Sequence, residues 1–234
     1  MRVLVACEES QEVCKAFRNK GHEAYSCDIL DPSGGHPEWH IQGDCLPIIN
    51  GDCTFQTLDS CAHTQEGPWD LLIAHPPCTY LCVSGNSYFN EERWGDKARE
   101  RKRLREEAAD FFMCFASANC ERIAIENPVG YMNSHFRKPD QIIQPWQFGH
   151  PFTKKTCLWL KGLPKLIPTN ILEKPENGWE NQQITKDGRY GGYGGSWCHA
   201  DGKWMRYGDP RVARERAKTF SGIAKAMAEQ WSND

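Results

Sequence analysis

The sequence predicts an α/β fold with a mainly parallel, twisted sheet, helices on both faces, and a small loop-rich insert near the C-terminus. Two patterns predict it. Short apolar runs typical of strands alternate with amphipathic patterns typical of helices. Charged or reactive residues repeatedly follow the apolar runs, at Asp28, Asp44, Cys78 and Glu126. Ligands of open parallel sheets bind outside the carboxyl ends of the strands, so we expect these four residues at one edge.

The first half of the chain is expected to alternate strands and helices. The expected elements are strands at 2–6, 23–27, 39–41 and 70–74, and helices from Ser10 to Gly21 and from about Asp96 to Ala118. Ser10 is a favourable helix N-cap and Gly21 a favourable stop. The second strand ends at Asp28, and an acid there is typical of nucleotide-binding folds because it can accept hydrogen bonds from ribose hydroxyls. Residues 45–68 are polar without a clear period, so we expect a loop with at most one weak helix.

The second half is expected to hold strands at 122–125 and 156–160. The long helix before them is amphipathic, with one apolar face formed by Leu104, Ala108, Phe111, Phe112 and Phe115. Between 164 and 209, glycines alternate with tryptophans and tyrosines, which predicts a loop-rich insert. Asp209-Pro210 predicts a helix start, and Ser221 is expected to cap the last helix. We therefore assign 1–163 and 210–234 to one domain that carries the insert 164–209.

The composition is typical of a soluble globular protein. The 234 residues include 28 Lys and Arg and 31 Asp and Glu, a formal net charge of -3, so any nucleic-acid surface has to be a local patch. No apolar run approaches the roughly 20 residues that span a bilayer. The 12 cysteines are scattered and no secretory signal precedes them. We expect reduced cysteines, a cytoplasmic location and no membrane contact.

Two short stretches carry the chemistry. The first, Ala74-His75-Pro76-Pro77-Cys78-Thr79-Tyr80, offers a thiol, and the second, Ile125-Glu126-Asn127-Pro128-Val129, offers a carboxylic acid. Each follows an apolar run, where a strand is expected to end in a loop. A thiol that adds to a ring carbon, together with an acid that handles a proton on a ring nitrogen, suits attack on a pyrimidine.

These stretches, in this order, resemble the cytosine-C5 DNA methyltransferases, and more closely their short phage and prophage forms. The resemblance implies a Rossmann-like fold, S-adenosylmethionine as cofactor, DNA as partner, and methyl transfer to cytosine C5 while Cys78 is bonded to C6. It also implies that Glu126 protonates N3, for which its pKa has to be raised by burial. The location is then a bacterial host or a phage-infected cell.

The resemblance also implies the remaining site residues. Cofactor contacts are expected from Ala6, Cys7, Glu8, Ser10, Asp28, Ile29, Asp44, Cys45 and Pro76. Lys154 is expected to keep an orienting role in catalysis, while Arg93, Arg99 and Lys102 are expected to contact nucleic acid. No metal is expected. The loop 6–11 lacks the closely spaced glycines of the family, and the segment 164–209 corresponds to a reduced target-recognition region.

Other interpretations remain open at this point. Cys78 could be a small buried residue, Asp28 and Asp44 could cap turns, and the basic run 93–105 could be a solvated helix face with Glu100 and Glu106 as partners. A loose group, Cys45, Cys53, Cys61 and His63, could hold a metal, although its spacing favours a loop. The segment 188–207 could stack bases or pack on the domain.

An RNA or free-nucleotide cytosine methyltransferase, or a catalytically idle nucleic-acid-binding relative, is the alternative function. The oligomeric state and the choice of single- or double-stranded DNA are left undetermined.

Overall fold

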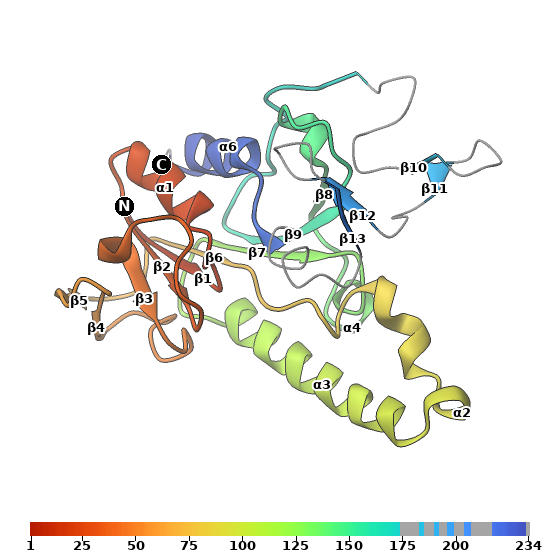
Figure 1. The fold of residues 1–234 in the computed structure, drawn as a ribbon. Coiled ribbons are helices and arrows are strands. Elements are labelled where there is room, and N and C mark those ends of the chain that lie inside the picture. The colour runs from red at the N-terminus through yellow and green to blue at the C-terminus, as the bar shows by residue number, and fades with distance from the viewer. Residues whose placement is uncertain (174–182, 185–189, 192–195, 199–203, 207–216, 233–234) are drawn as a thin grey trace.

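The computed structural model of the chain describes residues 1–173, 183–184, 190–191, 196–198, 204–206 and 217–232. Its centre is a seven-stranded sheet with the order β3-β2-β1-β6-β7-β9-β8 (Figure 1). The strands are β1 Arg2–Ala6, β2 Glu23–Asp28, β3 His40–Gln42, β6 Leu71–Ala74, β7 Ile123–Pro128, β8 Gln141–Ile143 and β9 Thr156–Lys161. The first five in chain order are parallel, whereas β9 runs antiparallel to both β7 and β8. The α/β class with a mostly parallel sheet is therefore confirmed.

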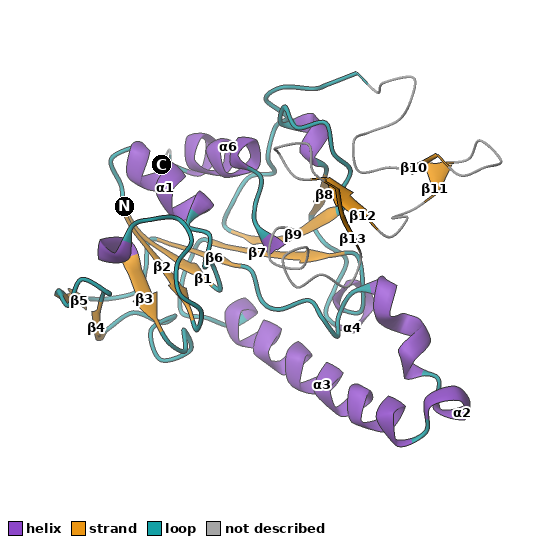
Figure 2. Cartoon of the chain, viewed as in Figure 1, coloured by secondary structure: helices purple, strands orange, loops and turns teal. Residues whose placement is uncertain are grey.

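Helices lie on both faces of this sheet (Figure 2). They are α1 Glu12–Asn19, α2 Glu91–Trp94, α3 Asp96–Ala116, α4 Met132–His135 and α6 Ser221–Trp231, with 3-10 turns η1 Pro37–Trp39, η2 Val83–Phe89 and η3 Pro145–Gln147. On one face α1 and α6 pack side by side, and the long α3 covers the other. Within the described part of the chain, no helix combines the length and apolarity that crossing a membrane requires.

The strands are buried on both sides because successive side chains of a strand point to opposite faces. Leu4 and Ala6 of β1 belong to the core under α3, together with Phe112. Val3 and Val5 of the same strand belong to the core under α1 and α6. This double coverage explains why the sheet strands appear in the sequence as continuous apolar runs.

The region 45–68, expected to be a loop, contains an antiparallel hairpin. Its strands are β4 Cys53–Gln56 and β5 Ala62–Gln65. Phe55 and Gln65 are buried while their strand neighbours are more exposed, and Phe55 packs its ring 5.0 Å from Tyr25. The period-2 pattern was hidden because polar threonines and glutamines make up half of each strand. Ser60, with φ 69°, closes the turn.

The two predicted helix caps are wrong, whereas the predicted stop is right. The N-cap position of α1 is Gln11, with φ 59°, and Ser10 makes no cap. A carboxylate two residues earlier replaces it: Val13 N and Cys14 N donate to Glu8 at 2.6 and 3.1 Å. Gly21, with φ 82°, follows the end of α1 as expected. Ser221 is the first residue of α6 and does not cap it.

The first part of the predicted insert packs on the main body. Leu166 is buried, and its backbone N–H and C=O both bond to the side chain of Gln141. Trp231 Nε1 of α6 donates to the Pro164 carbonyl at 3.0 Å. Later in the segment lie four two- or three-residue strands, β10 Gln183–Ile184, β11 Tyr190–Gly191, β12 Ser196–Cys198 and β13 Trp204–Arg206. The predicted helix start at Asp209-Pro210 lies outside the described residues.

Candidate active site

The adjacent strands β2, β1, β6 and β7 are in parallel register at this edge, and this aligns corresponding residues across them. In the sheet register Ala6 pairs with Cys27 and Ala74, and Ala74 pairs with Ile125. One position further along the four strands are Cys7, Asp28, His75 and Glu126. The carboxyl edge of the sheet therefore presents a thiol, two acids and an imidazole in one row.

Glu126 does not end its strand, as the sequence suggested, but lies inside β7. The strand continues to Pro128 because β9 pairs with it throughout, with Glu126 opposite Leu158. Its side chain is only 10% exposed. His75 Nδ1 lies 3.1 Å from Glu126 Oε2, Thr219 Oγ1 donates to the same oxygen at 3.4 Å, and Lys154 Nζ lies 3.8 Å from Oε1.

These contacts overturn the expectation that burial raises the pKa of Glu126. Burial does oppose ionisation, but the hydrogen bond from His75 and the positive charges of Lys154 and His75 outweigh it and lower the pKa to about 2. For His75, burial opposes protonation, but the hydrogen bond and charge of Glu126 prevail, helped by Glu8, and raise its pKa. The lowered pKa of Glu126 and the raised pKa of His75 both favour an imidazolium paired with a carboxylate.

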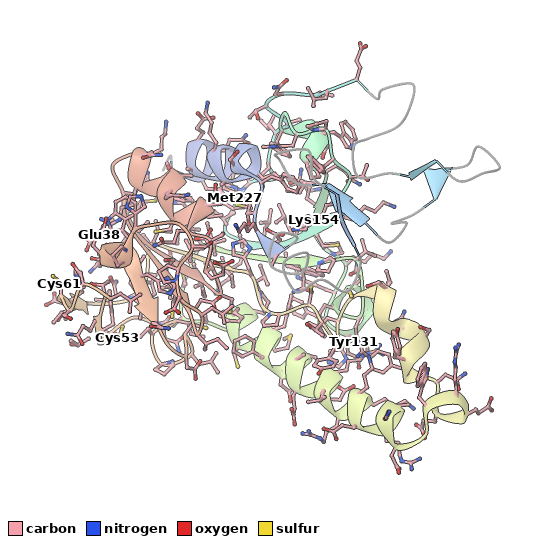
Figure 3. The ribbon with its side chains drawn as sticks, in the orientation of Figure 1. Glu38, Cys53, Cys61, Tyr131, Lys154 and Met227 are labelled. Carbon is pink, nitrogen blue, oxygen red and sulfur yellow. The ribbon has the colours of Figure 1, made fainter. Side chains whose placement is uncertain are left out.

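Cys78 lies four residues past the end of β6, after the Pro76-Pro77 turn, and it is exposed. The interpretation of Cys78 as a small buried residue is therefore wrong. Its carbonyl accepts hydrogen bonds from Leu81 N and Cys82 N, both at 3.0 Å, which closes a tight turn. The protein around the thiol desolvates it and raises its pKa, Cys82 adds to this effect, and Lys154 opposes it. Lys154, which is labelled in Figure 3, thus acts on both the thiol and Glu126.

Backbone contacts join the segment after Cys78 to the segment after Glu126. Tyr131 N donates to the Leu81 carbonyl at 2.7 Å, and Val83 N donates to the Val129 carbonyl at 3.2 Å. Gly130 makes the close approach possible, since a Cβ there would lie 1.9 Å from the Leu81 oxygen. The thiol and the carboxylate are thus held on connected backbone.

Asn127 completes this connection from inside the protein. Its Nδ2 donates to the Pro76 carbonyl at 2.8 Å, which ties β7 to the turn before Cys78. Among the residues that the structure describes, neither its Oδ1 nor His75 Nε2, both buried, has a hydrogen-bond partner. Both atoms therefore keep unused hydrogen-bonding capacity at this edge.

The expected cofactor residues divide into two groups, of which the first lines the open edge. Asp28 is half-buried, and burial raises the pKa of its carboxyl group; its Oδ1 accepts from Leu30 N at 2.9 Å. Ile29 beside it is 74% exposed. Asp44 likewise accepts from Leu46 N at 3.0 Å, so both aspartates make the turn-capping bonds considered above. Cys7 Sγ lies 3.9 Å from Sγ of Cys45, which is buried in the core and, unlike the others, does not line the edge.

The second group is turned into the protein. Glu8 and Ser10 are buried, as are Ala6 within β1 and Pro76. Both carboxylate oxygens of Glu8 accept hydrogen bonds from backbone N–H groups at the N-terminus of α1, and burial raises the pKa of Glu8 to about 7. The loop nevertheless makes the turn that glycines make elsewhere, because Cys7 and Gln11 both adopt φ 59°.

The basic run divides between two faces of α3. Arg99 and Lys102, two of the expected nucleic-acid contacts, form exposed ion pairs: Arg99 with Glu91 and Asp96, Lys102 with Glu91. The third, Arg93, lies over the Trp94 ring at 5.2 Å. Of the partners suggested for this run, Glu100 pairs with Arg103, whereas Glu106 accepts from the hydroxyl of Tyr131, the residue labelled in Figure 3.

On the other face of α3, two arginines hold the loop that carries Cys78. Arg101 Nη2 donates to the Thr79 carbonyl at 3.1 Å, and Arg105 Nε donates to the Tyr80 carbonyl at 3.2 Å. Their side chains thus fix the backbone of the first two residues after Cys78. The sequence had not separated these arginines from their neighbours.

Within the residues that the structure describes, no group of three or more His, Cys, Asp and Glu side chains is arranged to hold a metal. His63 of the loose cysteine group has other partners on both ring nitrogens, the Tyr25 hydroxyl at 3.0 Å and Thr57 Oγ1 at 3.0 Å. The hairpin β4 and β5 thus uses this histidine structurally.

Sequence reasoning missed three residues of the site, namely His75, Asn127 and Thr219. His75 and Asn127 stand inside the two stretches that attracted attention, and the register of adjacent parallel strands could have paired His75 with Glu126. Thr219 lies 93 residues from Glu126 and carries no local signal. No protein-family model matches this sequence, and a search of curated proteins finds no match either.

Proposed function

We propose that this protein transfers a methyl group from S-adenosylmethionine to C5 of cytosine in DNA, through a covalent bond between Cys78 and C6. The observation that carries the proposal is the joined pair of segments at the carboxyl edge. One presents an exposed thiol, and the other presents a carboxylate paired with a histidine whose pKa that carboxylate raises. On this proposal the fold is a Rossmann-like methyltransferase, and the target base is flipped out of its stack to reach the thiol.

The chemistry assigns a task to each side chain. The Cys78 thiolate adds to C6, and the electron pair of the C5=C6 bond becomes available at C5 while N3 gains a proton. Once C5 has gained the methyl group, a base removes the C5 proton, the double bond reforms, N3 gives its proton back to Glu126 and Cys78 leaves as thiolate. Lys154 favours the thiolate, because its ammonium group lowers the pKa of Cys78.

The proton for N3 comes from the His75 and Glu126 pair. With a pKa near 2, Glu126 does not store this proton itself, whereas the raised pKa of His75 keeps one on the imidazole. As negative charge develops on the ring, His75 gives its proton to Glu126, and Glu126 protonates N3. The relay replaces the directly protonated glutamic acid that the sequence suggested.

The ends of β1, β2 and β3 fit S-adenosylmethionine. Asp28 offers carboxylate oxygen for ribose hydroxyls, the exposed Ile29 offers an apolar contact for the adenine ring, and Asp44 lies just past β3. The backbone turn at Cys7 and Gln11 lets the chain pass close to a ligand at the end of β1. When bound, the cofactor supplies an electrophilic methyl group.

Labelled S-adenosylmethionine tests the proposal. Wild-type protein is expected to place label on cytosine-containing DNA, and Cys78→Ala to place none. Cys82→Ala is the matched control, since it removes the neighbouring thiol and is expected to retain transfer. The proposal fails if wild-type protein labels no cytosine, or if Cys78→Ala labels it as well. Transfer RNA and dCMP assayed in parallel distinguish the RNA and free-nucleotide alternatives.

A catalytically idle nucleic-acid-binding protein is the second candidate. It is favoured by the raised pKa of Cys78 and by the burial of Glu8 and Ser10, which removes two of the implied cofactor contacts. Calorimetry separates the two candidates. An idle protein shows no saturable binding of S-adenosylmethionine or its demethylated product, yet still binds DNA with salt-dependent affinity.

A further inference from the structure

A groove of about 490 Å³ lies between η2, α2 and α3, next to the loop that carries Cys78. We propose that it binds an unpaired nucleobase of the substrate strand, adjacent to the cytosine that Cys78 attacks. The inference rests on the proposed function and deepens it, because it makes a locally single-stranded nucleic acid the substrate. The volume lies within the range of about 300–1,000 Å³ that small-molecule sites occupy.

Aromatic rings form much of the groove wall. The Tyr88 and Trp94 rings have centroids 5.4 Å apart and are tilted by 42°, and Tyr88 is 50% exposed. The Arg101 guanidinium lies 5.0 Å from the Tyr80 ring and 5.4 Å from the Tyr88 ring. Aromatic faces and arginine planes are the surfaces on which unpaired bases stack, whatever their sequence.

The charges along the groove favour a phosphate-bearing ligand. Its two acids are already paired, Asp96 with Arg99 and Glu100 with Arg103. Lys97 and Arg101 lie one helical turn apart on the same face of α3, and neither forms an ion pair with any residue that the structure describes. Lys97 and Arg101 are therefore the two cations of the groove lining that can contact the backbone phosphates of a strand.

The groove and the nucleophile share one loop. Tyr80 follows Cys78 by two residues, and Arg101 donates to the Thr79 carbonyl between them. A base in the groove therefore belongs to a nucleotide close to the one presented to the thiol. The buried Nε1 of Trp94 and Nε of Arg101 have no acceptor in the part of the chain that the structure describes, and the ring nitrogens and carbonyl oxygens of a base are acceptors.

Fluorescence anisotropy with a labelled single strand of about 12 nucleotides tests the site without cofactor or turnover. Tyr88→Ala and Trp94→Leu are each expected to weaken binding about tenfold, the loss typical of one stacking ring. Tyr88→Phe, which keeps the ring, is expected to bind within about twofold of wild type, and shows that any loss reflects stacking rather than misfolding.

The contribution of positive charge to binding is tested by one variant in the groove and one control variant far from it. Lys97→Ala is expected to weaken binding and to lower the salt dependence by about one phosphate contact. Lys20→Ala removes the same charge from the exposed end of α1, across the sheet, and is expected to leave binding unchanged. A fully paired duplex is expected to bind more weakly than the single strand and to be insensitive to Tyr88→Ala.

The site is excluded if Tyr88→Ala and Trp94→Leu bind the single strand as wild type does, or if the duplex depends on the two rings equally. These results are separate from the fate of the proposed function. If the groove variants lose affinity while wild-type protein transfers no methyl group, the base site stands and methyl transfer falls. If wild-type protein transfers the methyl group but the groove variants bind the single strand as tightly as wild type, methyl transfer stands and the base site falls.

Discussion

A buried carboxylate next to a buried imidazole is stabilised only while the two groups keep opposite charges, and this constrains Glu126 and His75 tightly. Both side chains are about nine-tenths buried, and each shifts the pKa of the other toward its charged form. Breaking such a pair leaves an uncompensated charge in a poorly solvated place. The chemistry of the site and the stability of the fold therefore depend on the same proton.

Glu126→Gln is predicted to lower the free energy of unfolding by about 3 kcal/mol near pH 5.5. The lowered pKa of Glu126 stabilises the fold above its ordinary value of 4.5, and this contribution is lost as the pH falls toward 2. The raised pKa of His75 stabilises the fold below its ordinary value of 6.5, and this contribution is lost as the pH rises through the raised value.

Urea unfolding of wild type and Glu126→Gln at several pH values measures this difference directly. The difference in free energy of unfolding between wild type and Glu126→Gln should be largest between about pH 4.5 and 6.5, and should become smaller at lower and at higher pH. A gap that stays constant from pH 3 to pH 9 would show that the two groups do not share a charge.

Lys154 is predicted to act on the thiol as a charge. Lys154→Ala removes the ammonium group that lowers the pKa of Cys78, so alkylation of Cys78 by iodoacetamide should need a higher pH. Lys154→Arg retains the charge and should restore much of the wild-type profile. Mass spectrometry of the peptide that contains Cys78 follows the reaction at this one thiol. Identical pH profiles for all three proteins would place Lys154 outside the environment of the thiol.

At the scale of secondary-structure elements, the site is formed where the two segments that follow strands β6 and β7 are hydrogen-bonded to each other. The segment after β6 and the segment after β7 touch through backbone at Leu81, Gly130 and Tyr131. On the far side, Arg101 and Arg105 of α3 hold the same loop by its carbonyls. The position of the thiol is therefore set by β7 and α3 as well as by β6.

Gly130→Ala is predicted to displace the Cys78 loop, because the added Cβ would lie 1.9 Å from the Leu81 oxygen. We expect a loss of about 1–3 kcal/mol in stability, as for other overpacked positions, and a larger proportional loss of methyl transfer. Thermal unfolding and labelled-methyl assays on the same preparation measure both. An alanine variant with wild-type activity would show that the junction does not position the thiol.

At the scale of the whole molecule, an open sheet places chemistry at one edge from strands that are distant in sequence. Cys7, Asp28, His75 and Glu126 become neighbours only because β2, β1, β6 and β7 are adjacent and in parallel register. The two apolar cores on either side of the sheet hold that alignment. The proposed cofactor residues lie toward β2 and β3, and the proposed reactive pair toward β7, along the same edge.

Much of this edge could be predicted because the apolar runs and the long amphipathic α3 are strong local signals. Cys78 and Glu126 were recognised for their residue types and flanking prolines. The antiparallel β9, which keeps Glu126 inside a strand, could not be predicted, because a run such as 156–161 carries no sign of its direction. The charge state of Glu126 was likewise predicted wrongly, since it depends on His75 and Lys154, which tertiary structure brings to it.

The most direct measurement of the central claim is a covalent trap. Fluorine at C5 of cytosine cannot be removed as a proton, so after methyl transfer Cys78 has no route to leave the ring. Wild-type protein is incubated with S-adenosylmethionine and an oligonucleotide that contains 5-fluorocytosine. It is predicted to form a stable adduct whose mass is the sum of the protein, the oligonucleotide and the transferred methyl group. Peptide mass spectrometry is expected to locate the bond at Cys78. Cys78→Ser should form none. Absence of the adduct with wild-type protein, or an adduct that persists in Cys78→Ser, would contradict the proposed reaction.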